Sequence, residues 1–296
     1  QLLNTTLIGL TSGSIYSLMA MSIVLVWRST RVINFAQAGL ALVSTYIGYE
    51  AVQLFDNYWI ALICAMLAGA AISAFIEIAF MRVLLKHTSS GPIASVAPII
   101  ATLGLLGIVK ALITMYWGGQ DAVIKPPLSN TGFSIGTSTL VFSPMKLAII
   151  ASVAVLVILF SLIFQKTNIG LALRASAYAP EIAQLAGIRV SGIRTLGWAI
   201  AGAAGGLAGM LYVPGSYLHP NAMDVLLVFG FIAAVIGGLD SLFGAVAGAM
   251  ILGFAINFAT SYISYKLVFI TAFALLITVL LVKPNGIFSS SKGRKD

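Results

Sequence analysis

Nine long apolar stretches follow one another along this chain, and they constrain its fold more than any other feature of the sequence. A helix needs about 20 predominantly apolar residues to cross the hydrocarbon core of a bilayer. The chain is 60% hydrophobic and only 8% charged, whereas a soluble domain carries about 25% charged residues. The sequence therefore predicts an all-α integral membrane protein, a polytopic helical bundle of about eight or nine spans. The candidate spans are residues 2–26, 36–54, 58–81, 93–116, 146–165, 193–213, 223–238, 242–262 and 267–282.

The apolar pattern also indicates how this bundle is organised. A membrane β-barrel would show weaker, alternating segments of about ten residues, so a helical bundle is favoured. The stretch 223–238 is short and ends in Gly237-Gly238, which predicts one or two broken or re-entrant helices. We interpret residues 1–296 as a single transmembrane domain.

Small residues recur at helical spacing in two of the stretches. Glycines and alanines that are three or four residues apart let membrane helices approach closely, so we interpret both stretches as packing faces. The first is GWAIAGAAGGLAGML, with Gly197, Gly202, Gly205, Gly206 and Gly209, and the second carries Gly244, Gly248 and Gly253.

The basic residues predict the orientation of the chain. If the stretches alternate in direction, most basic residues fall on one side, which the positive-inside rule assigns to the cytoplasm. This places the N-terminus outside and the C-terminus inside, with a cytoplasmic loop at 166–194 and extracytoplasmic loops at 118–143 and 213–224. The net charge of +8 then reflects topology, and we do not expect nucleic-acid binding. Lys110 and Lys146 are expected to snorkel from span ends.

The longer extracytoplasmic loop carries a further local signal. Residues alternate between polar and apolar in GFSIGTSTLVF (132–142), a pattern that is typical of β-strands. We therefore predict a small hairpin within this loop.

The sequence carries no set of residues typical of catalysis or metal binding. It contains no G-x-x-x-x-G-K-[ST] nucleotide loop, and neither Cys64 nor the two histidines lie at metal-ligand spacing. Glu77 lies five residues before Arg82, so we expect it to be paired with that arginine or solvated at the interface. Because no carboxylate or histidine falls at the middle of a span, the energy source for any transport is expected to lie in another protein.

One short polar segment interrupts this apolar pattern between residues 166 and 194. Asn168 is a candidate N-cap for a first helix, and Pro180 can begin a second because its missing N–H costs nothing in a first turn. Glu181 favours the positive end of that helix, and Gly187 suits the position after its last turn. Ile182 and Leu185 share one face. Such a helix can lie on a membrane surface, fit a groove in another protein, or serve as a connector.

Three ordered motifs resemble the permease subunits of ATP-binding-cassette importers of the branched-chain amino acid type. GSIYSLMAMSIVLVWRSTRVINFAQAGLALVSTYIGY resembles the amino-terminal signature of that family. AAVIGGLDSLFGAVAGAMILG resembles its carboxy-terminal signature, and the segment that begins GLALRASAYAPEIAQLAGIRV resembles its cytoplasmic loop. Together the motifs span nearly the whole chain.

The resemblance implies a division of labour among several proteins in a bacterial or archaeal cytoplasmic membrane. A second related permease subunit would complete the pathway, two ATP-binding subunits would dock from the cytoplasm, and an extracytoplasmic binding protein would deliver the substrate. ATP and magnesium would then bind to the partner subunits, and this chain would hold no cofactor and catalyse no reaction. The loop's short helix would be the coupling helix in a groove of an ATP-binding subunit. The residues that fall in this coupling region are Arg174, Ala175, Glu181, Ile182, Ala183, Leu185, Gly187 and Ile188.

The resemblance also implies alternating-access uptake of branched-chain or other hydrophobic amino acids. The family commonly reads Asn-Phe-Ala-His-Gly-Asp/Glu where this chain has NFAQAG from Asn34 to Gly39, so the ring and the acid are both absent. Uptake of urea or short amides therefore remains an alternative, as does a self-sufficient carrier or channel. The candidate residues for the pathway are Asn34, Gln37, Ser12, Ser14, Tyr16 and Thr102.

Overall fold

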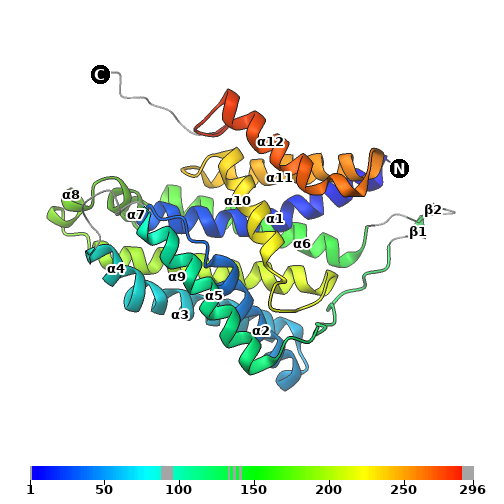
Figure 1. Cartoon of the computed structure of the whole chain (residues 1–296), viewed down its shortest axis with the longest axis horizontal. Helices are drawn as coiled ribbons and strands as arrows, with labels where there is room; N and C mark the ends of the chain where they lie inside the picture. The colour runs from blue at the N-terminus through cyan, green and yellow to red at the C-terminus, as the bar shows by residue number, and fades with distance from the viewer. Residues whose placement is uncertain (1, 88–95, 133, 136–137, 140–141, 289–296) are drawn as a thin grey trace. The chain divides into compact units, whose positions relative to one another are not determined.

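The computed structural model describes residues 2–87, 96–132, 134–135, 138–139 and 142–288, and this part of the chain is nearly all helical (Figure 1). Besides α-helices, it contains one π-helical turn (η1), two 3₁₀ turns (η2 and η3) and two very short strands. The elements in chain order are α1 (Leu2–Thr30), α2 (Gln37–Phe55), α3 (Tyr58–Ile76), η1 (Glu77–Met81), α4 (Arg82–His87), α5 (Ala97–Trp117), β1 (Ser134–Ile135), β2 (Ser138–Thr139), α6 (Pro144–Lys166), α7 (Asn168–Tyr178), α8 (Pro180–Leu185), α9 (Val190–Tyr212), η2 (Val213–Gly215), α10 (Asp224–Gly237), α11 (Leu242–Tyr262), η3 (Tyr265–Leu267) and α12 (Val268–Val282).

Seven helices of the described chain are long and apolar enough to cross a membrane. They are α1, α3 with η1 and α4, α5, α6, α9 with η2, α11, and η3 with α12. This confirms a nearly all-helical chain in which seven of the predicted spans are helices of sufficient length and apolar character. The other two predicted spans are helices as well. However, α2 is not among the seven, and α10 has 14 residues, about 21 Å against a hydrocarbon core of about 30 Å. Whether α2 and α10 cross the membrane stays a prediction.

Several helix ends differ from the apolar stretches that predicted them. The first helix continues to Thr30 and the third continues through η1 to His87, whereas the apolar stretches end at residues 26 and 81. Helix α9 begins at Val190, inside the loop predicted at 166–194. Arginine and lysine are good helix formers, so a helix continues past the charged residue at which an apolar stretch stops.

The predicted hairpin is present in the described part of the loop between α5 and α6. Strands β1 and β2 are antiparallel, and Ser134 pairs with Thr139 while Ile135 pairs with Ser138. In addition, Ala122 exchanges two backbone hydrogen bonds with Leu218, both at 2.9 Å. The first part of this loop is therefore joined to the loop between α9 and α10.

The chain divides into two compact units. One comprises residues 1–24, 128–157 and 228–296, and the other comprises residues 25–127 and 158–227. The first contains α11 and is the α11 unit, and the second contains α9 and is the α9 unit.

In the α9 unit, helices α2, α3 and α9 pack against one another, and each contacts the other two (Figure 1). Two rows of glycines on α9 face α2 and α3. Gly202 and Gly206 lie against Gly69 and Ala65 of α3, and Gly205 and Gly209 lie against α2 at Gln37, Ala41 and Thr45. The predicted packing face on α9 is therefore confirmed, and it serves two helices because the glycines fall on two four-residue rows.

Close backbone approach also holds the α11 unit together. Gly253 of α11 lies against the backbone of Gly13 in α1, and Gly248 lies against α10 at Ala233 and Gly237. The chain after α12 returns to α10, where the Ile287 N–H donates to the Ile236 carbonyl at 2.8 Å. The second predicted packing face, on α11, is thus confirmed as well.

The contact at Gly202 gives a test of this packing. A Cβ atom at Gly202 would lie 2.5 Å from Ser73 Cβ and 2.7 Å from the Gly69 carbonyl carbon, whereas a Cβ at Gly192 of the same helix would meet nothing within 4 Å. We expect Gly202→Ala to lower the free energy of unfolding by about 1–3 kcal/mol because the backbone of α3 cannot yield easily. The matched change Gly192→Ala should be neutral or slightly stabilising. Thermal unfolding in detergent measures both, and equal midpoints for the two variants would contradict the packing argument.

Candidate functional site

The segment predicted to form a loop at 166–194 is mostly helical. It runs from the end of α6 through α7 and α8 into α9, and α7 and α8 both pack against α9. The cap of α7 is Thr167 and not Asn168, because the Thr167 hydroxyl accepts a hydrogen bond from the Gly170 N–H at 3.3 Å. Both residue types are good N-caps, and the extended backbone of Thr167 selects the earlier position.

The end of α8 follows the sequence prediction closely. Pro180 opens the helix, and Gly187 has a φ of 82°, a left-handed conformation that glycine adopts without strain. The Ile188 N–H donates to the Ala183 carbonyl at 2.9 Å, and the Gly187 N–H donates to the Gln184 carbonyl at 3.0 Å. This pair of bonds is a Schellman motif, which turns the chain sharply toward α9.

One face of α8 is apolar and exposed. The side chains of Ile182 and Leu185 are 69% and 89% exposed, whereas Ala183 is 3% exposed. Glu181 is exposed in the first turn. Arg174 and Ala175 lie half-buried on the preceding helix α7. The helix thus presents two large apolar side chains beside a carboxylate, while its small residue packs inward.

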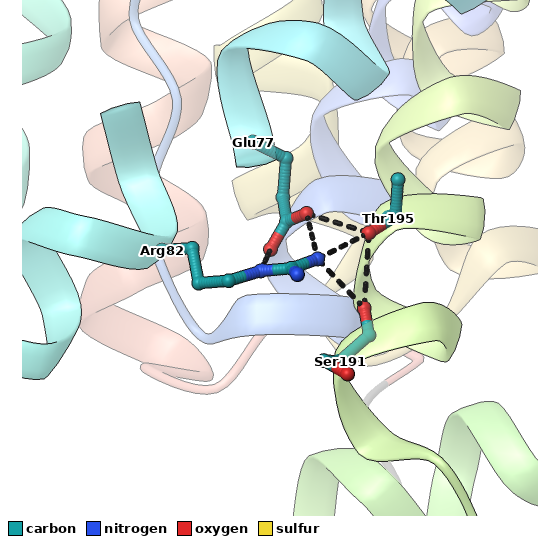
Figure 2. Close-up of polar contacts among 4 residues, drawn as sticks. All are labelled: Glu77, Arg82, Ser191 and Thr195. Atoms are coloured by element: carbon teal, nitrogen blue, oxygen red, sulfur yellow. Dashed lines mark hydrogen bonds and ion pairs between the residues drawn. The ribbon is translucent and has the colours of Figure 1, made fainter. Parts of the chain in front are cut away.

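A buried carboxylate anchors the start of α9 (Figure 2). Glu77 is only 1% exposed, and its Oε2 accepts hydrogen bonds from Arg82 Nη2 at 2.8 Å and from the Thr195 hydroxyl at 2.6 Å. Arg82 Nη2 also donates to Thr195 Oγ1 at 2.6 Å and to the Ser191 carbonyl at 3.2 Å. The expected pairing of Glu77 with Arg82 is confirmed, and it joins the end of α3 to the first two turns of α9.

The π-helical turn explains this pairing. Glu77 opens η1, and the Arg82 N–H donates to the Glu77 carbonyl across that turn. An i→i+5 backbone bond is the pattern of a π-helix, which is frequent at functional sites. The side chains five residues apart are therefore brought to the same side of the helix.

Three of the predicted pathway residues meet at the break between α1 and α2. Asn34 Oδ1 accepts a hydrogen bond from the Ala36 N–H at 3.0 Å, and Asn34 Nδ2 donates to Gln37 Oε1 at 3.4 Å. Gln37 Nε2 donates to the Ala201 carbonyl of α9 at 3.1 Å. Thr102 of α5 accepts a hydrogen bond from the Phe35 N–H at 3.4 Å.

These three side chains form a polar cluster inside an apolar bundle. Asn34, Gln37 and Thr102 are each at most 1% exposed. Asn34 and Thr102 satisfy backbone N–H groups that the helix break leaves without intrahelical partners, and Gln37 bonds a carbonyl in the middle of α9. The cluster therefore holds the break in one conformation, and it connects the break to both α5 and α9.

The remaining pathway candidates lie on the part of α1 that belongs to the α11 unit. The Ser14 hydroxyl donates to the Leu10 carbonyl at 2.8 Å, and the Tyr16 ring packs edge-on against Phe229 with centroids 5.1 Å apart. Ser12 is half-buried. The contacts of Ser14 and Tyr16 are typical of helix packing.

Lys110 forms an ion pair that links α5 to α10. Its ammonium group lies 2.6 Å from the Asp224 carboxylate and 3.1 Å from Asn221 Oδ1. The snorkelling of Lys110 from a span end stays a prediction, and the structure adds a partner for it at the start of α10. The sequence analysis did not predict this pair, because the two residues lie more than a hundred positions apart in the chain.

Sequence reasoning also missed Ser191 and Thr195. The signal for them was weak, namely a pair of hydroxyl residues four positions apart in the first turns of α9.

Within the described residues, no group of three or more histidine, cysteine or acidic side chains could hold a metal ion.

A family model described as "Branched-chain amino acid transport system / permease component" matches residues 5–282. The "Probable branched-chain amino acid transport permease protein LivH" of Methanocaldococcus jannaschii is 29% identical over 91% of this chain and 87% of its own length. The "High-affinity branched-chain amino acid transport system permease protein BraD" of Pseudomonas aeruginosa is 28% identical over 97% of this chain and 95% of its own length.

A relative with a different printed substrate also matches. The "Guanosine ABC transporter permease protein NupQ" of Bacillus subtilis is 29% identical over 67% of this chain and 61% of its own length. No solved structure matches the chain.

The Glu77 cluster gives a test of how the start of α9 is held. Removal of one partner from a buried ion pair costs about 3–5 kcal/mol, because the other charge is left buried. Arg82 is 38% exposed in its side chain, so we expect Arg82→Ala to cost about 3 kcal/mol, the lower end of that range.

The double variant Glu77→Gln/Arg82→Ala should recover much of that loss because it removes the unpaired charge, and Thr195→Ser should change little because it keeps the hydroxyl. Thermal unfolding in detergent compares the three variants. A double variant no more stable than Arg82→Ala would refute the assigned pairing.

Proposed function

The chain belongs to the family of branched-chain amino acid transport system permease components, and we propose that it imports branched-chain or other hydrophobic amino acids as one subunit of an ATP-driven transporter. Members of this family are transport permeases and not enzymes. The printed names of the relatives that cover nearly all of this chain support this substrate class. Translocation would proceed by alternating access in the cytoplasmic membrane.

The observation that carries the proposal is the exposed apolar face of α8. Burial of a leucine or isoleucine side chain contributes about 1.5–3 kcal/mol each, so Ile182 and Leu185 represent binding free energy that the isolated chain does not use. The rigid stop at Gly187 and the packing of α7 and α8 against α9 hold this face in a fixed position. We assign α8 as the coupling helix that fits a groove of an ATP-binding subunit.

The other residues of the coupling region have separate roles in this proposal. Glu181 and Arg174 would make charged contacts with the ATP-binding subunit. Ala183 lies against this chain's own bundle. Gly187 and Ile188 turn the chain into α9. Nucleotide and magnesium would bind to the ATP-binding subunits, and no cofactor is assigned to this chain.

The polar cluster at the break between α1 and α2 is proposed as part of the pathway. Asn34, Gln37 and Thr102 are uncharged, and a weakly binding path suits a system in which an extracytoplasmic binding protein selects the substrate. Ser12, Ser14 and Tyr16 are proposed to line the path on the α11 unit. A second related permease subunit would complete it.

The topology that accompanies this proposal has eight or nine spans. It counts α2 as a span and α10 as a broken or re-entrant helix, with the N-terminus outside and the C-terminus in the cytoplasm. Segments 118–143 and 213–224 would then face the binding protein.

Guanosine transport is the second candidate, and one observation favours it. The relative from Bacillus subtilis, which covers 67% of this chain, is printed as a guanosine permease. Binding of leucine, isoleucine, valine, urea and guanosine to the partner binding protein separates the candidates. Tight binding of guanosine or urea and not of leucine would exclude the amino acid assignment.

The coupling assignment predicts the effect of charge on the α8 face. The double change Ile182→Asp/Leu185→Asp should lower ATP-dependent uptake by at least about tenfold and release the ATP-binding subunits, because loss of a central apolar anchor costs about 2 kcal/mol or more. Uptake in proteoliposomes and co-purification of the subunits measure the two effects.

The matched control is Gln184→Asp, which adds a charge to the same helix without loss of an apolar side chain and should keep most of the uptake. Full uptake by the double variant would refute the role of α8. Uptake by the unmodified chain alone, driven by an ion gradient, would instead identify a self-sufficient carrier.

A further inference from the structure

Arg31 links the segment before α8 to the break between α1 and α2. It follows the last residue of α1, and its N–H donates to the Trp27 carbonyl at 2.7 Å. Its φ is 57°, a left-handed conformation that costs free energy for any residue with a Cβ atom. Strained backbone of this kind persists where surrounding contacts hold it, and it clusters at switch regions.

Two aromatic rings hold the guanidinium group of Arg31. Its Cζ atom lies 4.7 Å from the centroid of the Tyr178 ring and 5.6 Å from that of the Trp27 ring. Both distances are within the range of cation–π attraction. Tyr178 is the last residue of α7, and only Ala179 separates it from α8. Tyr178, two residues before α8, therefore contacts Arg31, which begins the break between α1 and α2.

The contacts on the two sides of α8, at Tyr178 before it and at Thr195 after it, differ in strength. At the far end, Thr195 and Arg82 share the buried carboxylate of Glu77. At the near end, Tyr178 is 72% exposed, so its contact with Arg31 lies at the surface and can open without the loss of core packing. A force on α8 can therefore open the contact of Tyr178 with Arg31 while α7 stays packed against α9.

Arg31 lines a pocket beside the break. A cavity of about 360 Å³ is lined by Trp27, Arg31, Ile33, Leu85 and Pro98, among other residues. A movement of Arg31 would be carried by the chain directly to Ile33 and Asn34. Ile33 and the following residues contact Thr102, whose hydroxyl lies 3.5 Å from the Ile33 carbonyl. The polar cluster would then rearrange with Arg31.

We infer that the contact between Arg31 and Tyr178 transmits movement of α8 to the polar break between α1 and α2. Arg31 and Tyr178 are positioning residues in this inference, since neither is assigned to contact the substrate or the nucleotide. The inference rests on the proposed function, because it needs α8 to be moved by an ATP-binding subunit.

The test compares transport with ATP hydrolysis in the assembled transporter. The complex with its ATP-binding subunits and binding protein is reconstituted in proteoliposomes, and leucine uptake and ATP hydrolysis are measured in parallel for Tyr178→Ala and Tyr178→Phe. We expect Tyr178→Ala to lower uptake per ATP hydrolysed by about fivefold, the factor that corresponds to a cation–π contact at a surface. Tyr178→Phe keeps the ring and should keep the ratio.

A double-mutant cycle gives a second readout. Arg31→Lys keeps the charge but loses the planar group that stacks on the rings, so it should lower the same ratio. Combined with Tyr178→Ala, it should add less loss than it causes alone, because both changes remove the contact between Arg31 and Tyr178 and only the stacking on Trp27 is lost in addition. Additive effects would overturn the inference.

The remaining outcomes also decide between the proposals. An unchanged ratio in Tyr178→Ala, or an equal loss in Tyr178→Phe, overturns the inference alone. Parallel loss of uptake and hydrolysis, with release of the ATP-binding subunits, assigns Tyr178 to docking and likewise overturns it. Uptake by the unmodified complex that does not need ATP overturns the proposed function and this inference together.

Discussion

The close approach of α9 to α3 at Gly202 and Gly69 is the constraint on which the rest of the α9 unit depends. In a bilayer, helices gain little from apolar burial against one another, because lipid tails are as apolar as the side chains. Dense packing must supply the attraction instead, and it requires small residues at the contact. One glycine row on α9 lies against α3, and the neighbouring row lies against α2. This position brings the Ala201 carbonyl within reach of Gln37.

A helix held in this way connects two regions of different chemistry. Its first turns carry Ser191 and Thr195, which meet the Glu77 and Arg82 pair, and its middle contacts the polar cluster at the break. The exposed helix α8 directly precedes it in the chain. A permease that is moved by a partner needs rigid elements between the driven surface and the pathway. In the α9 unit, a buried carboxylate contact follows α8 at Glu77, whereas the contact that directly precedes α8, between Tyr178 and Arg31, lies at the surface.

Local signals predicted much of the candidate site. Pro180, Glu181 and Gly187 marked α8 correctly, because a first-turn proline and a left-handed glycine act through the backbone of neighbouring residues. The pairing of Glu77 with Arg82 was also foreseen, since the two residues lie in one helical segment. The cap of α7 was misplaced by one residue, at Asn168 instead of Thr167. Threonine and asparagine both suit an N-cap, so only the backbone conformation decides which of the two residues takes this position, and the sequence does not specify that conformation.

By itself, the sequence determined that the chain is a polytopic helical membrane protein, which stretches become helices, and which glycines serve packing. Each of these depends on residues close together in the chain, through the length of an apolar run or the spacing along one helix. Only the tertiary structure decided that Thr195 shares the carboxylate of Glu77, that Lys110 pairs with Asp224, and that Arg31 stacks on Tyr178. Each of these contacts joins residues more than a hundred positions apart in the chain. They form only where helix packing has fixed the distance between two elements, and no local pattern encodes that distance.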